Sequence, residues 1–474
     1  MVILVEGCVG LLGTVIGRDD NAKSLWIENK VKSWEAPLKL ANCSLVPAQM
    51  ALLFSRWMAN RPSYLARANS PELTSGSFQA YDSLVRAHFE RKHSLSLTNS
   101  FSAAMLQLPI RLGGVGFARS GDPVHLAAAF VSSMAITARH IIKTPLRSLG
   151  TGTISQLPTG LALTISLNTL HSVHDWPNSG FLPANLVQFF AKFKKASPAA
   201  TKGFQSGIDK TLQNAYFAGL LENGSPEQRA LLNSRAIPSA GAWMRTTAFT
   251  SDTRLTDSEV KFGLSLATNQ LPPNLPSHCF CGLPLTVEHT ISCPSGRAKL
   301  HRHNRLVNLF VSFASFHGVS HELVPRLTYE DCKNSLVPDA KFFLPLTVVQ
   351  VDVSVVSPLC PTNLPATARN GGTALLAREL AKNVKYLEKA NRQGDAFVPL
   401  VFETHGRPGA DVRKFLRQLT SQAGLSLTLP VSDCLMKLQL ELLRGNSYMA
   451  SSCMMRSRHF HAREQGAKYQ FLGE

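Results

Sequence analysis

The stretch V-V-Q-V-D-V-S-V, from Val348 to Val355, decides how the C-terminal half of this chain folds. From Val349 onward every second residue is valine, and Gln350, Asp352 and Ser354 alternate with the valines. Successive side chains of a β-strand point to opposite faces, so this pattern predicts a strand with one apolar and one polar face. We expect the apolar face to join a core and the polar face to present the Asp352 carboxylate.

A second carboxylate precedes this strand. Asp339 follows Pro338 and lies 352 − 339 = 13 residues before Asp352, a separation that suits two strands of one sheet. Two carboxylates brought together repel each other unless a cation lies between them. Mg²⁺ prefers oxygen ligands and water, so the spacing predicts a magnesium site formed by Asp339 and Asp352.

The residues that follow the strand predict a long helix with two stripes. The cationic stripe comprises Arg378, Lys382, Lys385 and Lys389. The separate apolar stripe comprises Leu376, Leu380, Val384 and Leu387. A basic helix face is usually just solvated. Here it follows an acidic strand, and a lysine beside a phosphate could stabilise the charge of a transition state and orient an attacking water.

Four residues of metal-binding type lie upstream, in the spacing C-x-C-x₇-H-x₃-C: Cys279, Cys281, His289 and Cys293. Thiolate and imidazole ligands in such a cluster suit a tetrahedral zinc ion. Gly282 allows the tight turn that lets the first two sulfurs face one point. The alternative interpretation is three free cysteines and a chance histidine. Because the spacing differs from that of a C₂H₂ finger, it predicts no base-reading helix.

Composition restricts the class of partner. The 474 residues include 49 Lys+Arg and 31 Asp+Glu, which gives a net charge of +18 and a pI near 9.7. Such a surplus favours nucleic acid over membrane as a partner, although a protein with merely basic surfaces would also show it. The nine cysteines are scattered outside the cluster, so we expect no disulfide framework and a reducing compartment. No stretch predicts a membrane anchor.

Residue patterning predicts a multidomain α + α/β protein. A short strand and a helix over residues 23–40 open the chain, and the segment from Leu108 to Pro123 is rich in glycine and proline, which predicts a compact turn. The pattern is mostly helical over 124–271, and a stiff linker follows at 272–278. From His301 onward a helix, strands, a long helix, a further strand and more helix predict an α/β domain with a mixed central sheet.

The pattern P-D-x₁₂-D followed by K-x-x-K-Y, which ends at Tyr386, resembles the restriction-like endonuclease of non-LTR retrotransposons, a variant of the PD-(D/E)xK nuclease fold. In that variant the motif lysine lies on the helix, and Ser354 occupies the usual lysine position here. The zinc cluster and the R-H-N at Arg302 to Asn304 also resemble this family. The resemblance implies that Asp339 and Asp352 hold Mg²⁺ and that the lysine pair and its neighbouring tyrosine assist: Lys382, Lys385 and Tyr386.

The similarity extends to both ends of the chain. LLGTVIG, from Leu11 to Gly17, and LPIRLGGVGF, from Leu108, look like the thumb and connector that follow a reverse-transcriptase palm. FVPLVFETHG, from Phe397 to Gly406, resembles the strand after the nuclease helix. The resemblance implies five segments: a thumb-like region at 1–123, a helical connector at 124–271, a zinc knuckle at 272–300, a restriction-like endonuclease at 301–445 and a basic tail at 446–474.

These observations together predict a Mg²⁺-dependent DNA endonuclease that nicks target DNA, with a structural zinc ion. The resemblance implies target DNA and element RNA as partners, no small-molecule substrate, and a nuclear location. The aromatic-x-Asp-Asp turn of a polymerase is not recognisable, so we expect no reverse transcription from this chain, which would be the C-terminal part of a polyprotein or a truncated copy. One alternative is a remnant that only binds RNA or DNA, and another is a helical scaffold.

Overall fold

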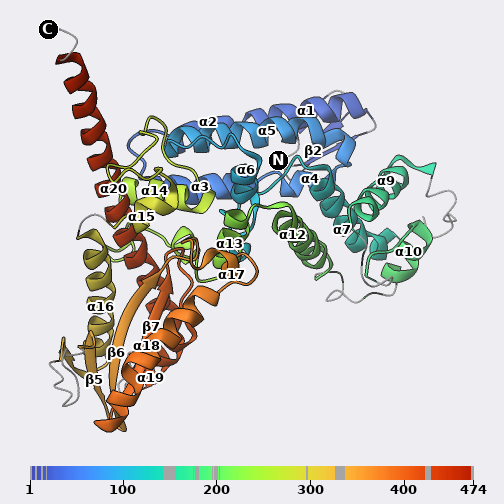
Figure 1. The fold of residues 1–474 in the computed structure, drawn as a ribbon. Coiled ribbons are helices and arrows are strands. Elements are labelled where there is room, and N and C mark those ends of the chain that lie inside the picture. The colour runs from blue at the N-terminus through green and yellow to red at the C-terminus, as the bar shows by residue number, and fades with distance from the viewer. Residues whose placement is uncertain are drawn as a thin grey trace. The chain divides into compact units, whose positions relative to one another are not determined.

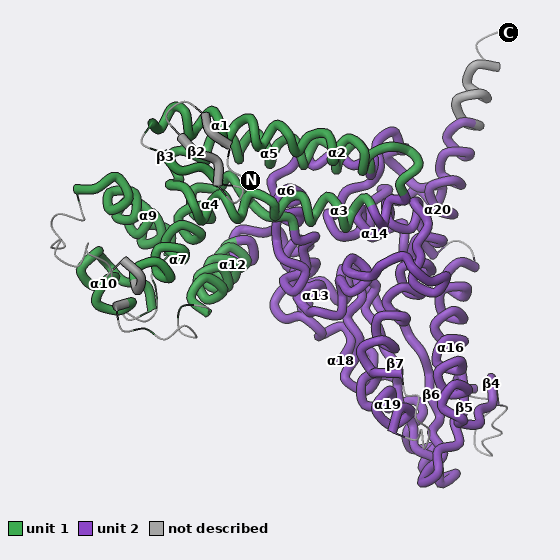
Figure 2. The backbone as a smooth tube through the Cα atoms, turned by 180° about the vertical axis from the view of Figure 1, so that it is seen from behind, with its two compact units in different colours: residues 1–46, 51–92, 117–219 green, residues 47–50, 93–116, 220–474 purple. Residues whose placement is uncertain are grey.

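The computed structural model describes residues 3–5, 8–11, 14–17, 19–141, 156–174, 176, 181–194, 196, 201, 203–294, 297–325, 337–421 and 429–470. The chain forms two compact units, coloured separately in Figure 2. Unit 1 comprises residues 1–46, 51–92 and 117–219, and unit 2 comprises 47–50, 93–116 and 220–474. The five segments expected from the sequence are defined by their roles rather than by packing, so they stay predictions. A segment belongs to the core against which it packs, and periodicity does not identify that core.

Unit 1 combines a small antiparallel sheet with helices. Its strands, in the order β1-β2-β3, are Ile3–Val5, Cys8–Leu11 and Thr14–Gly17. Its helices are α1 (Asp20–Lys32), α2 (Glu35–Ala41), most of α3 (Ala48–Ala59), α4 (Ser63–Ala68), all but the last residue of α5 (Pro71–His93), α7 (Pro123–Ile141), α9 (Pro158–Val173), α10 (Leu186–Lys194) and most of α12 (Phe204–Asn223). Alanine, leucine and phenylalanine side chains of α7, α9, α10 and α12 form one core.

The first helices show how local chemistry sets helix limits. The Asp19 carboxylate accepts a hydrogen bond from the Asn21 backbone N–H at 2.9 Å, which caps the start of α1. The single helix that we expected over residues 23–40 is wrong, because α1 ends at Lys32 and α2 begins at Glu35. Pro37 explains the break, since its ring would clash with the carbonyl group four residues earlier in a continuous helix.

Unit 2 contains a four-stranded mixed sheet in the order β4-β5-β6-β7 (Figure 1). Its strands are Ser320–Leu323, Ala340–Leu344, Thr347–Val356 and Ala396–Glu403; the first three are antiparallel, and β7 is parallel to β6. The helices are α6 (Ser100–Gln107), η1 (Ile110–Leu112), α13 (Pro226–Arg235), η3 (Ala242–Arg245), α14 (Asp257–Thr268), α15 (Val287–Ser292), α16 (Ala298–Phe316), α17 (Leu364–Thr367), α18 (Thr373–Arg392), α19 (Ala410–Ser421) and α20 (Val431–Gln470). The protein is therefore a mixed α and β structure, as expected.

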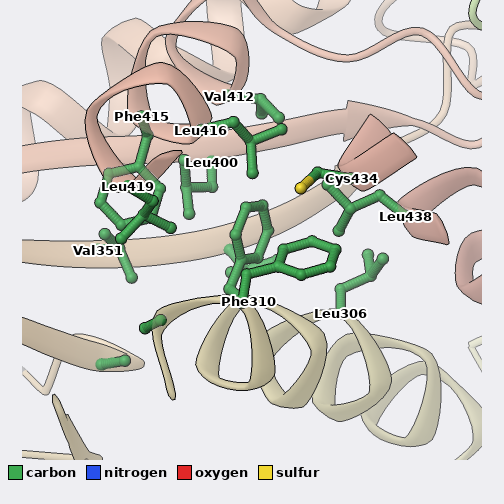
Figure 3. Close-up of a cluster of buried hydrophobic side chains, with 14 of the residues drawn as sticks. Leu306, Phe310, Val351, Leu400, Val412, Phe415, Leu416, Leu419, Cys434 and Leu438 are labelled. Atoms are coloured by element: carbon green, nitrogen blue, oxygen red, sulfur yellow. The ribbon is translucent and has the colours of Figure 1, made fainter. Parts of the chain in front are cut away.

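The valine face of β6 joins a core made with three helices. Val349, Val351 and Val353 are buried among side chains of α16, α19 and α20, and Figure 3 shows Phe310 of α16 at the centre of this cluster. Strand β7 contributes Leu400 to the same cluster. The alternation of valines therefore predicted the strand and its apolar face correctly.

The polar face of β6 is also buried, because α18 packs against β6 and β7. Helix α18 buries Ala374, Leu375, Glu379, Tyr386 and Ala390. The predicted apolar stripe of this helix lies instead on an exposed face: Leu376 and Leu380 are each 64% exposed, and Val384 is 80% exposed. Tyrosine, glutamate and small residues face the sheet because the sheet presents polar side chains there.

Helix α20 runs without a break through residue 446, where we expected a basic tail to begin. Its N-terminal half packs in the core that contains Phe310, and it also contacts α14, α15 and α16. The helix continues to Gln470, and residues 471–474 lie outside the described part of the chain.

Candidate active site and metal centre

Strand pairing brings the two predicted carboxylates together. Asp339 directly precedes β5, and Ala340 pairs with Val351 of β6, so the next position along places Asp339 beside Asp352. The Asp339 backbone N–H donates to the Val351 carbonyl at 2.9 Å, and the Asp339 carboxylate accepts from the Val353 N–H at 2.6 Å. The Asp339 side chain is therefore held over β6.

Each carboxylate has a cationic or hydrogen-bonding neighbour. Lys382 Nζ of α18 lies 2.6 Å from Asp352 Oδ1, and Ser354 Oγ donates to the same oxygen at 3.3 Å. His303 Nε2 of α16 lies 3.0 Å from Asp339 Oδ1. This hydrogen bond raises the pKa of His303 above its ordinary value of 6.5; burial opposes the shift, and the charges of both carboxylates add to it. The imidazolium form is thus favoured beside Asp339.

These groups line a cavity of about 280 Å³ whose charge is positive overall. Its two carboxylates, Asp339 and Asp352, face the imidazole of His303 and four basic side chains: Lys299, Arg302, Arg378 and Lys382. A cavity with two adjacent carboxylates inside a cationic rim suits a phosphodiester together with a divalent cation. The strand and helix patterns indicated the carboxylates, Lys382 and Arg378, but no sequence pattern placed Lys299 at this position.

Two predicted site residues lie beside the cavity and do not line it. Among the described residues of the cavity wall, neither Lys385 nor Tyr386 is present. Tyr386 is 3% exposed, stacks on Phe397 with ring centroids 5.0 Å apart, and directs its hydroxyl toward the Val337 carbonyl at 3.5 Å. Lys385 is exposed, and its Nζ lies 4.8 Å from the Tyr386 ring centroid. The tyrosine supports the helix, and the lysine faces solvent.

Arg302 lies between the cavity and helices α15 and α20. Its Nη1 donates to the Asn446 side-chain carbonyl of α20 at 2.7 Å and to the Ile291 carbonyl of α15 at 3.2 Å. Burial lowers the pKa of this guanidinium to about 10, so it remains charged at neutral pH. Gly445 allows this packing, since a Cβ there would lie 2.6 Å from Arg302 Cγ.

Glu403 does not serve the cavity as an additional carboxylate. A carboxylate at the end of a strand could serve as a further site acid, although such a group is usually solvated. Glu403 is instead fully buried, with its carboxylate bonded to the Ser234 hydroxyl and 3.7 Å from Arg407 Nε. Glu403 therefore has a structural role.

Three of the four predicted zinc ligands converge together with a cysteine that the sequence motif did not include. Ligand atoms of Cys279, His289, Cys293 and Cys453 all lie within 4.8 Å of one another, and all four residues are buried. Cys453 belongs to α20, 453 − 293 = 160 residues beyond the predicted cluster. Three sulfurs and one imidazole at this spacing could hold a metal ion such as zinc. A distant cysteine inside a helical pattern gives no spacing signal.

Cys281, the remaining predicted ligand, lies at the edge of this centre. It is partly exposed, and its Sγ lies 3.3 Å from His289 Nε2. Burial raises the pKa of the Cys279 thiol, but hydrogen bonds from the Cys281 backbone and from neighbouring side chains outweigh burial and lower this pKa to about 6. Cys279 thus favours the thiolate, the form that binds metal, whereas burial raises the pKa of the Cys281 and Cys453 thiols.

Neither models of known protein families nor curated proteins gave a match to this chain. Any functional conclusion therefore depends on the chemistry and geometry of the site itself. Among the described residues, no helix combines the length and the apolar character needed to cross a membrane.

Proposed function

We propose that this protein is a Mg²⁺-dependent DNA endonuclease that nicks duplex DNA at the cavity formed by Asp339, β6, α16 and α18. The observation that carries this proposal is that Asp339, Asp352 and Lys382 converge in one cavity whose rim carries basic side chains. The same three residues carry the resemblance to the nuclease of non-LTR retrotransposons. Nuclear location and element RNA as a second partner belong to the same proposal.

The carboxylates of Asp339 and Asp352 fit a hard divalent cation. Asp352 Oδ1 accepts from Lys382 and Ser354, and within the described residues Oδ2 accepts no hydrogen bond, so Oδ2 is available to a cation. The Val353 N–H orients the Asp339 carboxylate through Oδ2, and a cation bound at Oδ1 would replace the proton that His303 shares with this oxygen. Bound Mg²⁺ would polarise a phosphate oxygen and lower the pKa of a coordinated water.

The basic side chains would act on the phosphodiester itself. Lys382 Nζ lies close enough to Asp352 to meet a phosphate bound against that carboxylate, where it would stabilise the additional negative charge of the transition state. Lys299 and Arg378, which are exposed at the rim, would bind flanking phosphates. The excess of basic residues in the chain would supply further affinity that weakens as salt increases.

The alternative proposal is a protein that binds DNA or RNA without cutting it. The Lys382–Asp352 ion pair favours this alternative, because it neutralises one carboxylate that a cation would need. Salt-dependent binding is expected of both proposals and does not separate them.

Metal-dependent nicking separates the two proposals. Purified protein is incubated with supercoiled plasmid in Mg²⁺ or in chelator, and conversion to the open circle is measured by gel electrophoresis. We expect nicking only with Mg²⁺, and Asp352→Ala should abolish it while binding of the same DNA by gel shift is largely kept. Equal nicking by wild type and Asp352→Ala, or binding by wild type without any nicking, would contradict the endonuclease proposal.

A further inference from the structure

Five side chains of metal-binding type lie at the metal centre, but a tetrahedral ion binds only four ligands. Three of these side chains are buried and belong to residues 278–293, called the knuckle here: Cys279, His289 and Cys293. The candidates for the fourth position are Cys281 of the same knuckle and Cys453 of α20. We propose that Cys453 is the fourth ligand and that Cys281 remains outside the set, so that the ion ties helix α20 to the knuckle.

The distances between sulfurs favour Cys453. A zinc–sulfur bond of about 2.3 Å in a tetrahedral site places two sulfurs about 3.8 Å apart. Cys279 Sγ lies 3.9 Å from Cys293 Sγ and 3.6 Å from Cys453 Sγ, so both distances match the edge of such a tetrahedron. Cys281 Sγ lies 3.3 Å from His289 Nε2, but Cys281 does not belong to the group of ligand atoms that all lie within 4.8 Å of one another. Cys453 is also 2% exposed, whereas Cys281 is partly exposed.

One face of α20 fits the knuckle on both sides of Cys453. The Phe280 N–H donates to Ser457 Oγ at 3.3 Å, and His461 Nε2 lies 3.0 Å from the His278 carbonyl oxygen. Cys453, Ser457 and His461 are spaced four residues apart, which places them on one helix face. This face of α20 therefore packs against the knuckle, and the Cys453 sulfur lies at its buried end.

The same two elements hold Arg302. Asn446 lies seven residues before Cys453 on α20, and Ile291 lies two residues before Cys293 on the knuckle; both bond Arg302 Nη1. An ion that joins Cys293 to Cys453 therefore fixes both partners of Arg302, which makes Arg302 a positioning residue between the metal centre and the cavity. Only this last step depends on the proposed nuclease function; the choice of ligand does not.

The test uses Co²⁺ and Zn²⁺ with the full chain in a Cys281→Ser background, because this background removes the thiol that could substitute for Cys453. Cys281→Ser alone should keep the wild-type thiolate-to-Co²⁺ charge-transfer intensity and the wild-type zinc affinity. Adding Cys453→Ser should lower zinc affinity about 100-fold or more and reduce the charge-transfer intensity by about a third. Cys281→Ser with Cys434→Ser is the matched control, since Cys434 is also buried on α20 but lies in the core around Phe310.

Two results would overturn the proposal. One is loss of a thiolate signal in Cys281→Ser alone, which would make Cys281 the ligand. The other is unchanged metal binding after Cys453→Ser is added. If that double variant fails to fold by circular dichroism, Cys281→Ser with Cys453→His decides the question. A ligand at position 453 predicts retained zinc with two-thirds of the charge-transfer intensity, about the ratio of two thiolates to three; an unchanged spectrum would contradict it.

Discussion

Two lysine–aspartate pairs lie next to each other on the same face of one sheet, and they differ in what surrounds them. Lys382 Nζ lies 2.6 Å from Asp352 Oδ1, and Lys341 Nζ lies 2.7 Å from Asp395 Oδ2. In both pairs the aspartate side chain is 6% exposed, and the lysine side chains are 14% and 18% exposed. Length and burial therefore do not distinguish the pairs.

Their neighbours do distinguish them. Each aspartate also has a neutral donor, because Asp395 accepts from the Gln350 amide at 2.7 Å and Asp352 from the Ser354 hydroxyl at 3.3 Å. Only Asp352 of the two lies beside a second carboxylate, that of Asp339, in the described cavity. An ion pair becomes a candidate catalytic group when a like charge and open space adjoin it. Both features lower the stability of the folded protein, and they bring an advantage only when a ligand binds.

Among the basic residues, removal of Lys382 should give the largest effect on activity. We expect Lys382→Ala to lower the nicking rate about 10²- to 10³-fold, because the ammonium would no longer stabilise the transition-state charge. Lys385→Ala, on the exposed side of the same helix, should lower DNA affinity only slightly and leave the rate of the bound complex unchanged. Single-turnover nicking measures both. Similar losses in both variants would show that the helix acts only as a basic surface.

Removal of Asp395 should have the larger effect on folding. Asp395→Asn leaves the Lys341 ammonium without its counter-charge, which we expect to lower the free energy of unfolding by about 2 kcal/mol. Asp352→Asn should cost less, because it also removes repulsion between Asp352 and Asp339. Guanidinium unfolding of the Mg²⁺-free proteins compares them. A greater loss from Asp352→Asn would mean that this pair is chiefly structural.

The His303–Asp339 pair should give the smallest effect, and one that depends on pH. The pKa of His303 is raised in the folded protein, so the folded state binds this proton more tightly than the unfolded chain does. Its stabilising contribution is complete below pH 6.5 and disappears as the pH rises through the raised pKa. We expect His303→Gln to cost below about 1 kcal/mol at pH 6 and almost nothing at pH 8.5, measured by chemical unfolding. A cost that grows with pH would contradict this sign.

Local periodicity was sufficient to predict the strand, its core face and the carboxylates. The alternation of Val349, Val351 and Val353 with polar residues is a property of the strand alone, and 13 residues accommodate a tight turn between neighbouring strands. These patterns need no knowledge of distant contacts, so sequence reasoning reached them.

Other features depend on contacts between residues far apart in the chain. Cys453 reaches the metal centre through the path of α20, and Lys299 reaches the cavity through the orientation of α16. Neither has a local pattern that indicates its partner. The stripe of Leu376, Leu380 and Val384 was recognised from its spacing, but its exposure follows from the polar side chains that the sheet presents to α18. Tertiary packing decides such cases.

The most direct measurement compares the nicking rates of Asp352→Asn and Asp395→Asn on the same supercoiled plasmid at saturating Mg²⁺, corrected for the folded fraction of each protein. We expect Asp352→Asn to lose at least about 10²-fold in rate. Asp395→Asn should nick at the wild-type rate. Equal rates for the two variants would contradict the assignment of the cavity as the place where DNA is cut.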